Sequence, residues 1–236
     1  MIEIRGIEKK FGRQHVLKGV NSKIKAGKIT AILGHNGSGK TTLIKNILGL
    51  SIPDHGDIEI NGERINGNWE HRSRIGYMSQ LTHFPSNLKV KELFSMIKDI
   101  RGQNGNEEYF IELFDLKSEL DKKLDYLSGG TKQKVNATLA FMFDSPILIC
   151  DEPTVGLDPI SLIHLKEILR QAKKEGKTIL LITHILSFVE ELCDEIIFLQ
   201  EGVCYFQGTH QELKHAQTED TLEKAIANMM IKLKNV

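Results

Sequence analysis

The amino-acid sequence predicts an α/β fold with a mixed central sheet, an antiparallel β-subdomain and an inserted helical subdomain. The sheet is indicated by two continuous apolar segments, residues 147–150 and 178–182, which alternate with an amphipathic helix over residues 161–174. Residues 81–127 lose strand character and place apolar side chains at helical spacing, which indicates the helical insert. Of the 236 residues, 40% are hydrophobic and 26% are charged, so we expect a folded globular chain and exclude a disordered one.

The antiparallel β-subdomain is predicted at the N-terminal end of the chain. Residues 1–7 and 16–24 alternate in polarity and are expected to pair around a turn at residues 11–14. A second turn is expected at residues 54–57, followed by a short strand at 58–60 that ends on an Asn-Gly hairpin signal. These segments together predict a small sheet that precedes the helical insert.

The C-terminal part of the chain predicts a hairpin and a terminal helix. Residues 196–199 and 203–206 are apolar and flank a Gln-Glu-Gly turn, which is typical of a β-hairpin. Residues 222–233 show helical spacing.

A glycine-rich loop joins an apolar strand, residues 28–33, to a helix. Two glycines separated by four residues and followed by Lys40 and Thr41 form a phosphate-loop pattern, which predicts a P-loop NTPase core. Glycines let main-chain N–H groups curl around a polyphosphate, and the helix directs its positive end at the same anion. We expect Lys40 to reach the β- and γ-phosphates of ATP and the Thr41 hydroxyl to bind Mg²⁺. The predicted ATP-binding residues of this loop are Gly34, His35, Asn36, Gly37, Ser38, Gly39, Lys40, Thr41 and Thr42.

Polar side chains follow the two buried strands of the predicted parallel sheet. Asp151 and Glu152 end the first strand, and His184 ends the second. Ligands of such sheets bind at the carboxyl ends of the strands. We therefore expect Asp151 to hold Mg²⁺ through water, Glu152 to polarise the attacking water and His184 to contact the γ-phosphate. The alternatives are a solvated strand end and a structural histidine, which the upstream phosphate loop disfavours.

A second anion-binding helix start is predicted at Ser128, Gly129 and Gly130, which open a helix that extends through Phe143. One γ-phosphate does not need two helix starts from the same subunit. We therefore expect head-to-tail pairing of two chains, in which the second helix start of each subunit closes the ATP site of the other.

The order of these motifs resembles that of the nucleotide-binding subunits of ABC transporters, and the resemblance covers essentially the whole chain. It implies that Phe11 takes the place of an aromatic residue that stacks on adenine, and that Gln80 contacts Mg²⁺ and senses a membrane partner. It also implies that the Gly-Leu-Asp segment at residues 156–158 links the two sites across the dimer. Family signatures usually have Gln where this chain has Thr131.

The same resemblance implies a single ABC-type ATPase domain over residues 1–236. Its helical subdomain is expected at about residues 81–145 and a C-terminal helical tail at about 209–236. The signature and the tail also look like those of exporter-type systems, including ATPases that serve copper-site maturation of nitrous oxide reductase. The cysteine spacing forms no copper site, so this sub-family assignment rests on likeness alone.

The function implied is ATP hydrolysis by a homodimer or pseudo-dimer that powers a separate transmembrane permease, with ATP and Mg²⁺ as cofactors. Net charge is zero, but residues 1–50 hold ten Lys and Arg against two Glu, a local charge of +8 that the nucleotide site explains. No nucleic-acid partner is expected. The alternative is a soluble ATP-switched protein acting on nucleic acid or ribosomes, a class that usually carries two cassettes or long coiled-coil insertions. A small-molecule kinase would need an acceptor site and no second helix start.

The chain is expected to be cytoplasmic and to reach the cytoplasmic face of the membrane only through its partner. The first residues lack the apolar core of a signal peptide, and the apolar runs are too short to cross a bilayer. Cys150, Cys193 and Cys204 are scattered and odd in number, which fits a reducing compartment and small buried side chains.

A contact with the membrane partner is expected just after Gln80. Leu81, Phe84, Pro85 and Leu88 follow this residue without an evident core of their own, so they could line a groove for a short helix of a membrane subunit. The alternative is that they pack beneath the helix that follows.

Overall fold

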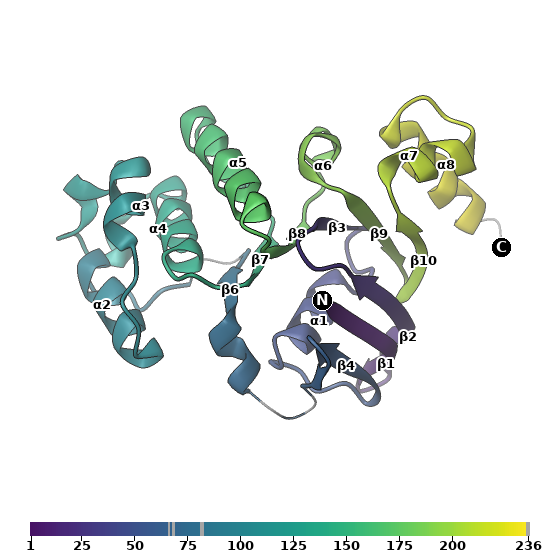
Figure 1. Cartoon of the computed structure of the whole chain (residues 1–236), viewed down its shortest axis with the longest axis horizontal. Coiled ribbons are helices and arrows are strands. Elements are labelled where there is room, and N and C mark those ends of the chain that lie inside the picture. The colour runs from purple at the N-terminus through teal and green to yellow at the C-terminus, as the bar shows by residue number, and fades with distance from the viewer. Residues whose placement is uncertain (66, 68, 81–82, 235–236) are drawn as a thin grey trace. The chain divides into compact units, whose positions relative to one another are not determined.

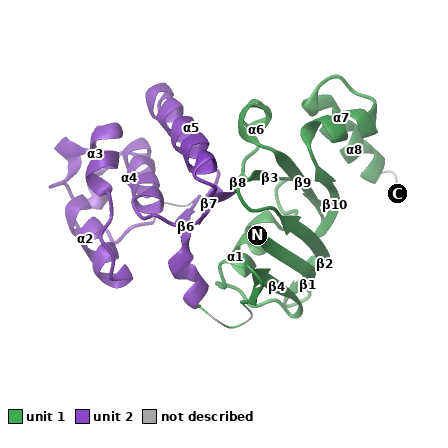
Figure 2. Cartoon of the chain, viewed as in Figure 1, with its two compact units in different colours: residues 1–69, 180–236 green, residues 70–179 purple. Residues whose placement is uncertain are grey.

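The computed structural model describes residues 1–65, 67, 69–80 and 83–234, and it divides into two compact units (Figures 1 and 2). The first unit comprises residues 1–69 and 180–236, and the second comprises residues 70–179. Both contain helices and strands, and together they confirm the predicted α/β class with parallel and antiparallel strands.

The first unit contains the predicted antiparallel β-subdomain as a four-stranded sheet of order β2-β1-β4-β5. Its strands are β1 (Ile2–Phe11), β2 (Gln14–Ile24), β4 (His55–Ile60) and β5 (Glu63–Arg64). Strand β4 starts at His55, where the sequence predicted a turn. The reason is a bulge: the register between β1 and β4 shifts between Arg5 and Glu8, and a Cβ atom at Gly56 would lie 2.4 Å from the Arg5 carbonyl oxygen.

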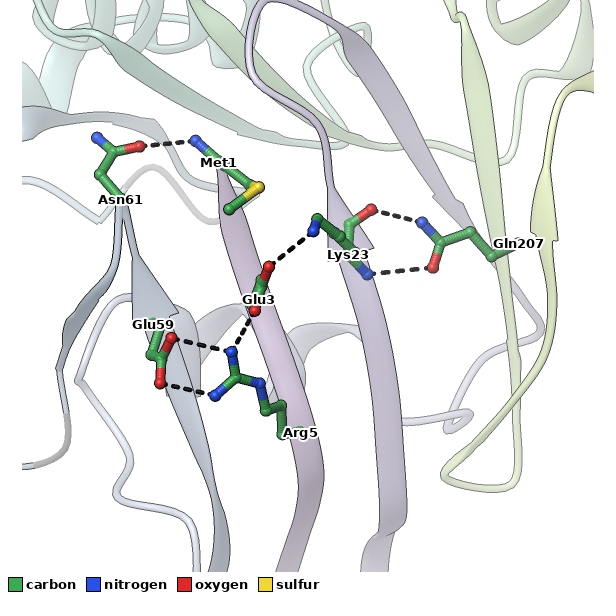
Figure 3. A network of polar contacts seen from close by, with 7 residues as sticks. All are labelled: Met1, Glu3, Arg5, Lys23, Glu59, Asn61 and Gln207. Atoms are coloured by element: carbon green, nitrogen blue, oxygen red, sulfur yellow. Dashed lines mark hydrogen bonds and ion pairs between the residues drawn. The ribbon is translucent and has the colours of Figure 1, made fainter.

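Charged side chains link neighbouring strands on one face of this sheet (Figure 3). The Arg5 guanidinium donates to both carboxylate oxygens of Glu59, at 2.8 and 3.1 Å, and also to Glu3. Lys23 pairs with Glu3 at 2.8 Å, and together with Arg5 it lowers the pKa of the Glu3 carboxyl. Gln207 of β10 (Val203–Gly208) donates to the Lys23 carbonyl oxygen at 2.6 Å, so the network also joins the second sheet of this unit.

The part of the second sheet that lies in the first unit is mixed and has the order β10-β9-β3-β8, with β8 belonging to this unit from Leu180 onward. β3 runs parallel to β9, and β9 pairs antiparallel with β10 in the predicted hairpin. All five residues of β3 are buried, as expected for a strand covered on both faces. The strands are β3 (Ile29–Leu33), β8 (Thr178–Ile182), β9 (Glu195–Gln200) and β10 (Val203–Gly208).

Four helices belong to the first unit. They are α1 (Lys40–Ile47), α6 (Leu186–Leu192), α7 (His210–Gln217) and α8 (Leu222–Lys234). Helices α1 and α8 were predicted from the sequence, and α7 lies within the helical tail expected at about residues 209–236, whereas α6 was not predicted. Thr209 caps α7, since its side chain accepts a hydrogen bond from the Glu212 N–H while the Glu212 carboxylate accepts one from the Thr209 N–H.

The second unit pairs two parallel strands, β6 (Ile75–Met78) and β7 (Ile147–Asp151), with helices. A Cβ atom at Gly76 would lie 2.3 Å from the Ala140 carbonyl oxygen, so β6 and the helix that contains Ala140 are in close contact. The helices are α2 (Val90–Arg101), α3 (Glu107–Leu113), α4 (Gly129–Phe141) and α5 (Pro159–Lys174). Three short 3-10 helices span Glu70–Arg74, Lys117–Glu119 and Leu124–Tyr126.

The three cysteines differ in their surroundings. Cys150 and Cys193 are buried, as predicted, and burial raises the pKa of the Cys150 thiol to about 12. Cys204 is only partly buried, and its Sγ donates to the Phe206 carbonyl oxygen at 3.6 Å. Across the described parts of the chain, every helix is too short or too polar to cross a membrane.

Candidate functional site

The phosphate loop of the first unit lies between β3 and α1. The Lys40 ammonium group donates to the Gly34 carbonyl oxygen at 2.7 Å and to that of His35 at 3.0 Å. The side chain therefore reaches back across the loop, and its positive charge lies beside the main chain that would surround a phosphate. Gly39 precedes α1 with φ 106°, and no side chain caps this helix.

The glycines of the loop are required by close contacts within the first unit. A Cβ atom at Gly34 would lie 2.0 Å from the Leu199 carbonyl oxygen, and one at Gly39 would lie 2.8 Å from a methyl group of Leu17. Both residues have positive φ angles, which non-glycine residues adopt only with strain. Strands β2 and β9 of the first unit thus pack directly against the loop.

Ser38 supplies a buried polar atom that suits a phosphate. Its side chain is fully buried, and within the described residues its hydroxyl oxygen has no hydrogen-bond partner. A buried hydroxyl without a partner costs free energy, and a phosphate oxygen would accept a hydrogen bond from it. The loop therefore fits a polyphosphate by its main chain, by Lys40 and by Ser38.

Two further predicted residues belong to the same unit as the loop. Phe11 ends β1 with 52% of its surface exposed, and the Lys9 ammonium lies 5.5 Å from its ring centroid. An exposed aromatic ring at a strand end is suited to stack on a planar base. His184 follows β8 and is exposed, while the preceding Thr183 is buried and accepts a hydrogen bond from the Ile185 N–H at 3.1 Å.

The predicted acidic pair belongs to the second unit. Asp151 ends β7 and is only 3% exposed, and its charge adds to the burial that raises the pKa of Tyr77 to about 12. Glu152 follows with φ 50°, a left-handed conformation that is uncommon outside glycine. Its carbonyl oxygen accepts a hydrogen bond from the Val155 N–H at 3.2 Å. The turn therefore redirects the chain directly after the buried carboxylate.

Gln80 lies exposed, two residues after β6 ends. The carbonyl oxygen of the preceding Ser79 accepts a hydrogen bond from the Asn136 side chain of α4 at 2.7 Å. Asn136 is buried, and the sequence analysis did not single it out. Its position on the inner face of α4 ties the chain just before Gln80 to the helix that begins with the signature.

The signature residues of the second unit begin α4 and face outward. Ser128 caps the helix, since its Oγ accepts a hydrogen bond from the Thr131 N–H at 3.2 Å. The hydroxyl groups of Ser128 and Thr131 lie 2.9 Å apart, so Thr131 supports the cap in the place where family members usually have Gln. Ser128 and Gly129 are exposed, and a Cβ atom at Gly129 would have no neighbour within 4 Å.

The segment at residues 156–158 is fastened to this helix. A Cβ atom at Gly130 would lie 2.7 Å from the Gly156 carbonyl oxygen, and Lys134 of α4 forms an ion pair with Asp158 at 2.8 Å. Asp158 also caps α5 by accepting hydrogen bonds from the N–H and the hydroxyl of Ser161, both at 2.9 Å. Lys134 and these bonds hold the pKa of the Asp158 carboxyl well below its usual range. The sequence analysis missed Lys134.

Of the residues expected to meet a membrane partner, Phe84 lines a small cavity in the second unit. The cavity has a volume of about 260 Å³ and is lined by His83, Phe84, Leu124, Asp125 and Lys132. Phe84 and Leu88 are half-buried. The sequence left two alternatives open for them, an exposed groove and a buried core, and their burial is intermediate between the two. Leu81, the first residue of the predicted groove, is outside the described residues.

The predicted site residues fall into two sets. Phe11, the phosphate loop and His184 belong to the first unit, whereas Gln80, the signature residues, Asp151 and Glu152 belong to the second.

Comparison with known proteins identifies the family. Residues 17–155 match the family model "ABC transporter". The Nod factor export ATP-binding protein I of Burkholderia lata is 35% identical over 90% of this chain and 72% of its own length. The L-cystine import ATP-binding protein TcyN of Bacillus subtilis is 32% identical over 94% of this chain and 91% of its own length.

Solved structures agree with this family. One described as the ATP-binding subunit of an ABC transporter has a TM-score of 0.91 at 30% identity, covering 98% of this chain and 99% of its own. A dimeric ATP-binding cassette in a post-hydrolysis state, bound to ADP and Pi, has a TM-score of 0.80 at 26% identity, covering 89% of this chain and 98% of its own.

The predicted link to copper-site maturation is not supported. The relatives named above act in Nod factor export and cystine import, and the described residues contain no group of three or more His, Cys, Asp or Glu that could hold a metal ion. The broader prediction is confirmed by the family match, by the relatives and by the neighbouring structures. The chain therefore belongs to the ABC transporter family, as one of its ATP-binding subunits that bind and hydrolyse ATP.

Proposed function

We propose that this chain hydrolyses ATP with Mg²⁺ at two shared sites of a head-to-tail homodimer and thereby powers a separate permease at the cytoplasmic face of a membrane. The observation that carries this proposal is the outward-facing start of α4. Ser128 and Gly129 are exposed, and among the described residues no atom would lie within 4 Å of a Cβ atom at Gly129. An anion-binding helix start whose first residues are exposed is suited to the nucleotide of a second subunit.

The first unit would hold ATP. The ring of Phe11 would stack on adenine, and residues Gly34 to Thr42 would surround the phosphates with main-chain N–H groups. Lys40 would neutralise charge on the β- and γ-phosphates, and the buried Ser38 hydroxyl would gain the acceptor that it lacks among the described residues.

Three oxygen-bearing side chains suit Mg²⁺, a hard cation that prefers oxygen ligands. They are the Thr41 hydroxyl, the Gln80 amide and the Asp151 carboxylate. Bound Mg²⁺ would offset the negative charge of the phosphates. Burial of Asp151 at the end of β7 keeps its carboxylate in place, and the exposure of Thr41 and Gln80 leaves both within reach of a ligand.

Glu152 and His184 would serve the hydrolysis step. The Glu152 carboxylate would accept a proton from the attacking water, while the His184 side chain would contact the γ-phosphate. The left-handed backbone at Glu152 supports this role, because strained non-glycine residues concentrate at functional sites.

A mixed dimer tests whether the sites are shared. Lys40→Ala and Ser128→Arg subunits, each inactive as a homodimer, would be combined and their ATP hydrolysis measured. In each head-to-tail heterodimer one site carries both lesions and the other carries neither, so we expect the heterodimer to have about half the activity of the parent dimer, and a random equimolar mixture about a quarter. If each site were built from one chain, both sites would remain damaged and the mixture would stay inactive.

A permease partner is favoured over a soluble nucleic-acid clamp by the relatives. Two of them, each about one-third identical to this chain, carry export and import in their names. Both relatives resemble this chain to a similar degree, although one is named for export and the other for import. This supports a model in which the ATPase subunit supplies energy and the permease selects the cargo.

The permease would contact the cavity beside Phe84, through a short helix with an apolar face. Replacing Phe84 and Leu88 by Ser should leave ATP binding and thermal stability near parental values and abolish co-purification with the permease. Ile100→Ser is the matched control, since Ile100 is an exposed apolar residue of α2 in the same unit. Unfolding of the double variant would show that the two side chains belong to the core and would refute this contact.

A further inference from the structure

We propose that Gly202, in the turn between β9 and β10, is a positioning residue that sets the distance between the adenine-side hairpin and the phosphate loop. The adenine-side hairpin is the β1–β2 pair, with Phe11 at the end of β1 beside the turn. The inference rests on the proposed binding of ATP to the first unit, and all residues involved belong to that unit.

Both main-chain polar groups of Gly202 bond to other elements. Its N–H donates to the Ser38 carbonyl oxygen in the phosphate loop at 3.0 Å. Its carbonyl oxygen accepts a hydrogen bond from the Lys18 N–H of β2 at 2.9 Å. A single residue thus bridges the loop that would hold the phosphates and the strand that returns from the adenine-side hairpin.

The packing around Gly202 leaves no room for a side chain. A Cβ atom there would lie 2.2 Å from the Val16 carbonyl oxygen and 3.1 Å from the Cα atom of Leu17. The same carbonyl oxygen would lie 3.1 Å from a Cβ atom at Gly39, directly before α1. The Val16 carbonyl is therefore in contact with two glycines, one in the β9–β10 turn and one in the phosphate loop.

The strand before this turn also contacts the loop. The Leu199 carbonyl oxygen fits against Gly34, where a Cβ atom would approach it to 2.0 Å. Leu199 and Gly202 therefore support the loop at its first glycine and at Ser38.

This arrangement predicts which ligands would sense a change at Gly202. Phe11 pairs with Gln14 across the hairpin turn, and Val16 follows two residues later on β2. A displacement of Val16 would therefore move the ring of Phe11 relative to the loop. ATP would contact both the ring and the loop, whereas tripolyphosphate would contact the loop alone.

The first experiment compares Gly202→Ala with Gly176→Ala. Both glycines have φ +81°, where any L side chain is strained, but among the described residues no atom would lie within 4 Å of a Cβ atom at Gly176. We expect Gly202→Ala to raise the Kd for ATP about tenfold or more, because small displacements of bound groups are costly, while the Kd for tripolyphosphate changes less than about threefold. Gly176→Ala should retain parental affinity for both ligands.

The second experiment is a double-mutant cycle with Phe11→Ala. If Gly202 acts by placing the ring, Gly202→Ala should weaken ATP binding much less once the ring is absent, to about twofold or below. A merely structural role would reduce affinity by the same factor in both backgrounds. That equal loss, or a parental Kd in the single Gly202→Ala variant, would overturn the inference.

Two controls keep the result interpretable. Should Gly202→Ala fail to fold, insertion of one glycine after Glu201 displaces the turn without adding a side chain, and it should show the same selective loss of ATP. Lys40→Ala tests the proposed ATP site itself. If Lys40→Ala binds ATP like the parent, the proposed function fails; if it loses ATP while Gly202→Ala retains it, only the positioning inference fails.

Discussion

Two helix starts in this chain offer main-chain N–H groups to an anion, and they are built in opposite ways. The start of α1 is enclosed: Ser38 and Gly39 are buried, and a Cβ atom at Gly34 would collide with the Leu199 carbonyl. The start of α4 is open: Ser128 and Gly129 are exposed, and a Cβ atom at Gly129 would meet nothing within 4 Å. Only the open start is capped by a side chain, that of Ser128.

The difference shows that the surroundings of a helix start decide what it can bind. The partial charge at both helix ends has the same origin. The enclosed start is shaped in advance by its own unit, so it can hold a phosphate without a large ordering cost. The open start presents one face only, and we infer that it acts when a second subunit brings a nucleotide to it.

The largest expected effect is on ATP affinity, and it should differ between variants of the two lysines nearest these helix starts. Lys40→Ala should weaken ATP binding to the isolated subunit about 100-fold, because it removes a charged donor from the phosphates. Lys132→Ala, four residues into α4, should leave that affinity unchanged. Calorimetric titration of both variants with ATP checks the comparison, and equal losses would show that α4 binds the nucleotide of its own chain.

A glycine pair should give effects of opposite sign on stability. Gly34→Ala should lower the free energy of unfolding by about 1–3 kcal/mol, since its Cβ atom overlaps a carbonyl oxygen, and should weaken ATP binding as well. Gly129→Ala should raise it by up to about 1 kcal/mol, because alanine favours the helix. Yet ATP hydrolysis by Gly129→Ala should fall, since in the proposed head-to-tail dimer the added methyl group would face the partner's nucleotide. Urea unfolding and hydrolysis assays check both; unchanged hydrolysis in a stabilised Gly129→Ala dimer would contradict a shared site.

The smallest effect concerns the ion pair that fastens the open start. Asp158→Asn keeps a capping side chain for α5 but removes the charge beside Lys134, and should cost less than about 1 kcal/mol at pH 7 because the Asp158 carboxylate is exposed to solvent. The folded-state pKa of Asp158 is lowered, so this stabilisation is present above about pH 4, the unfolded value, and is lost as pH falls further. The difference in unfolding free energy between parent and variant should therefore be full at pH 7 and smaller at about pH 3, as urea unfolding at both pH values would show. Asp99→Asn, an exposed control, should show no such difference at either pH.

The enclosed start was largely predictable from the sequence. The phosphate loop is recognisable from the spacing of its glycines. Strands β3, β7 and β8 are recognisable as continuous apolar segments, because strands that are buried on both faces have no polar face. The polar residues that end these strands, such as Asp151, were placed for the same reason. The Ser-Gly-Gly pattern likewise predicted the start of α4.

The supports of the loop could not be predicted, because they depend on contacts between distant segments. The sequence around Gly202 does not distinguish it from any other glycine in a turn. A glycine is required there because the Val16 carbonyl, which is distant in the sequence, leaves no room for a side chain. Lys134 looks like an ordinary solvated helix residue until Asp158 lies beside it. Helix α6 was missed because seven residues give too little periodicity to detect.

The burial of two of the cysteines makes this chain a convenient background for site-specific labelling. Cys150 and Cys193 are shielded from solvent, and the raised pKa of Cys150 leaves almost no thiolate to react at neutral pH. Only Cys204 needs replacement before a new cysteine is introduced at an exposed position such as Tyr126, two residues before the α4 cap. A spin label or fluorophore there would report distances between two subunits while the native core cysteines stay silent.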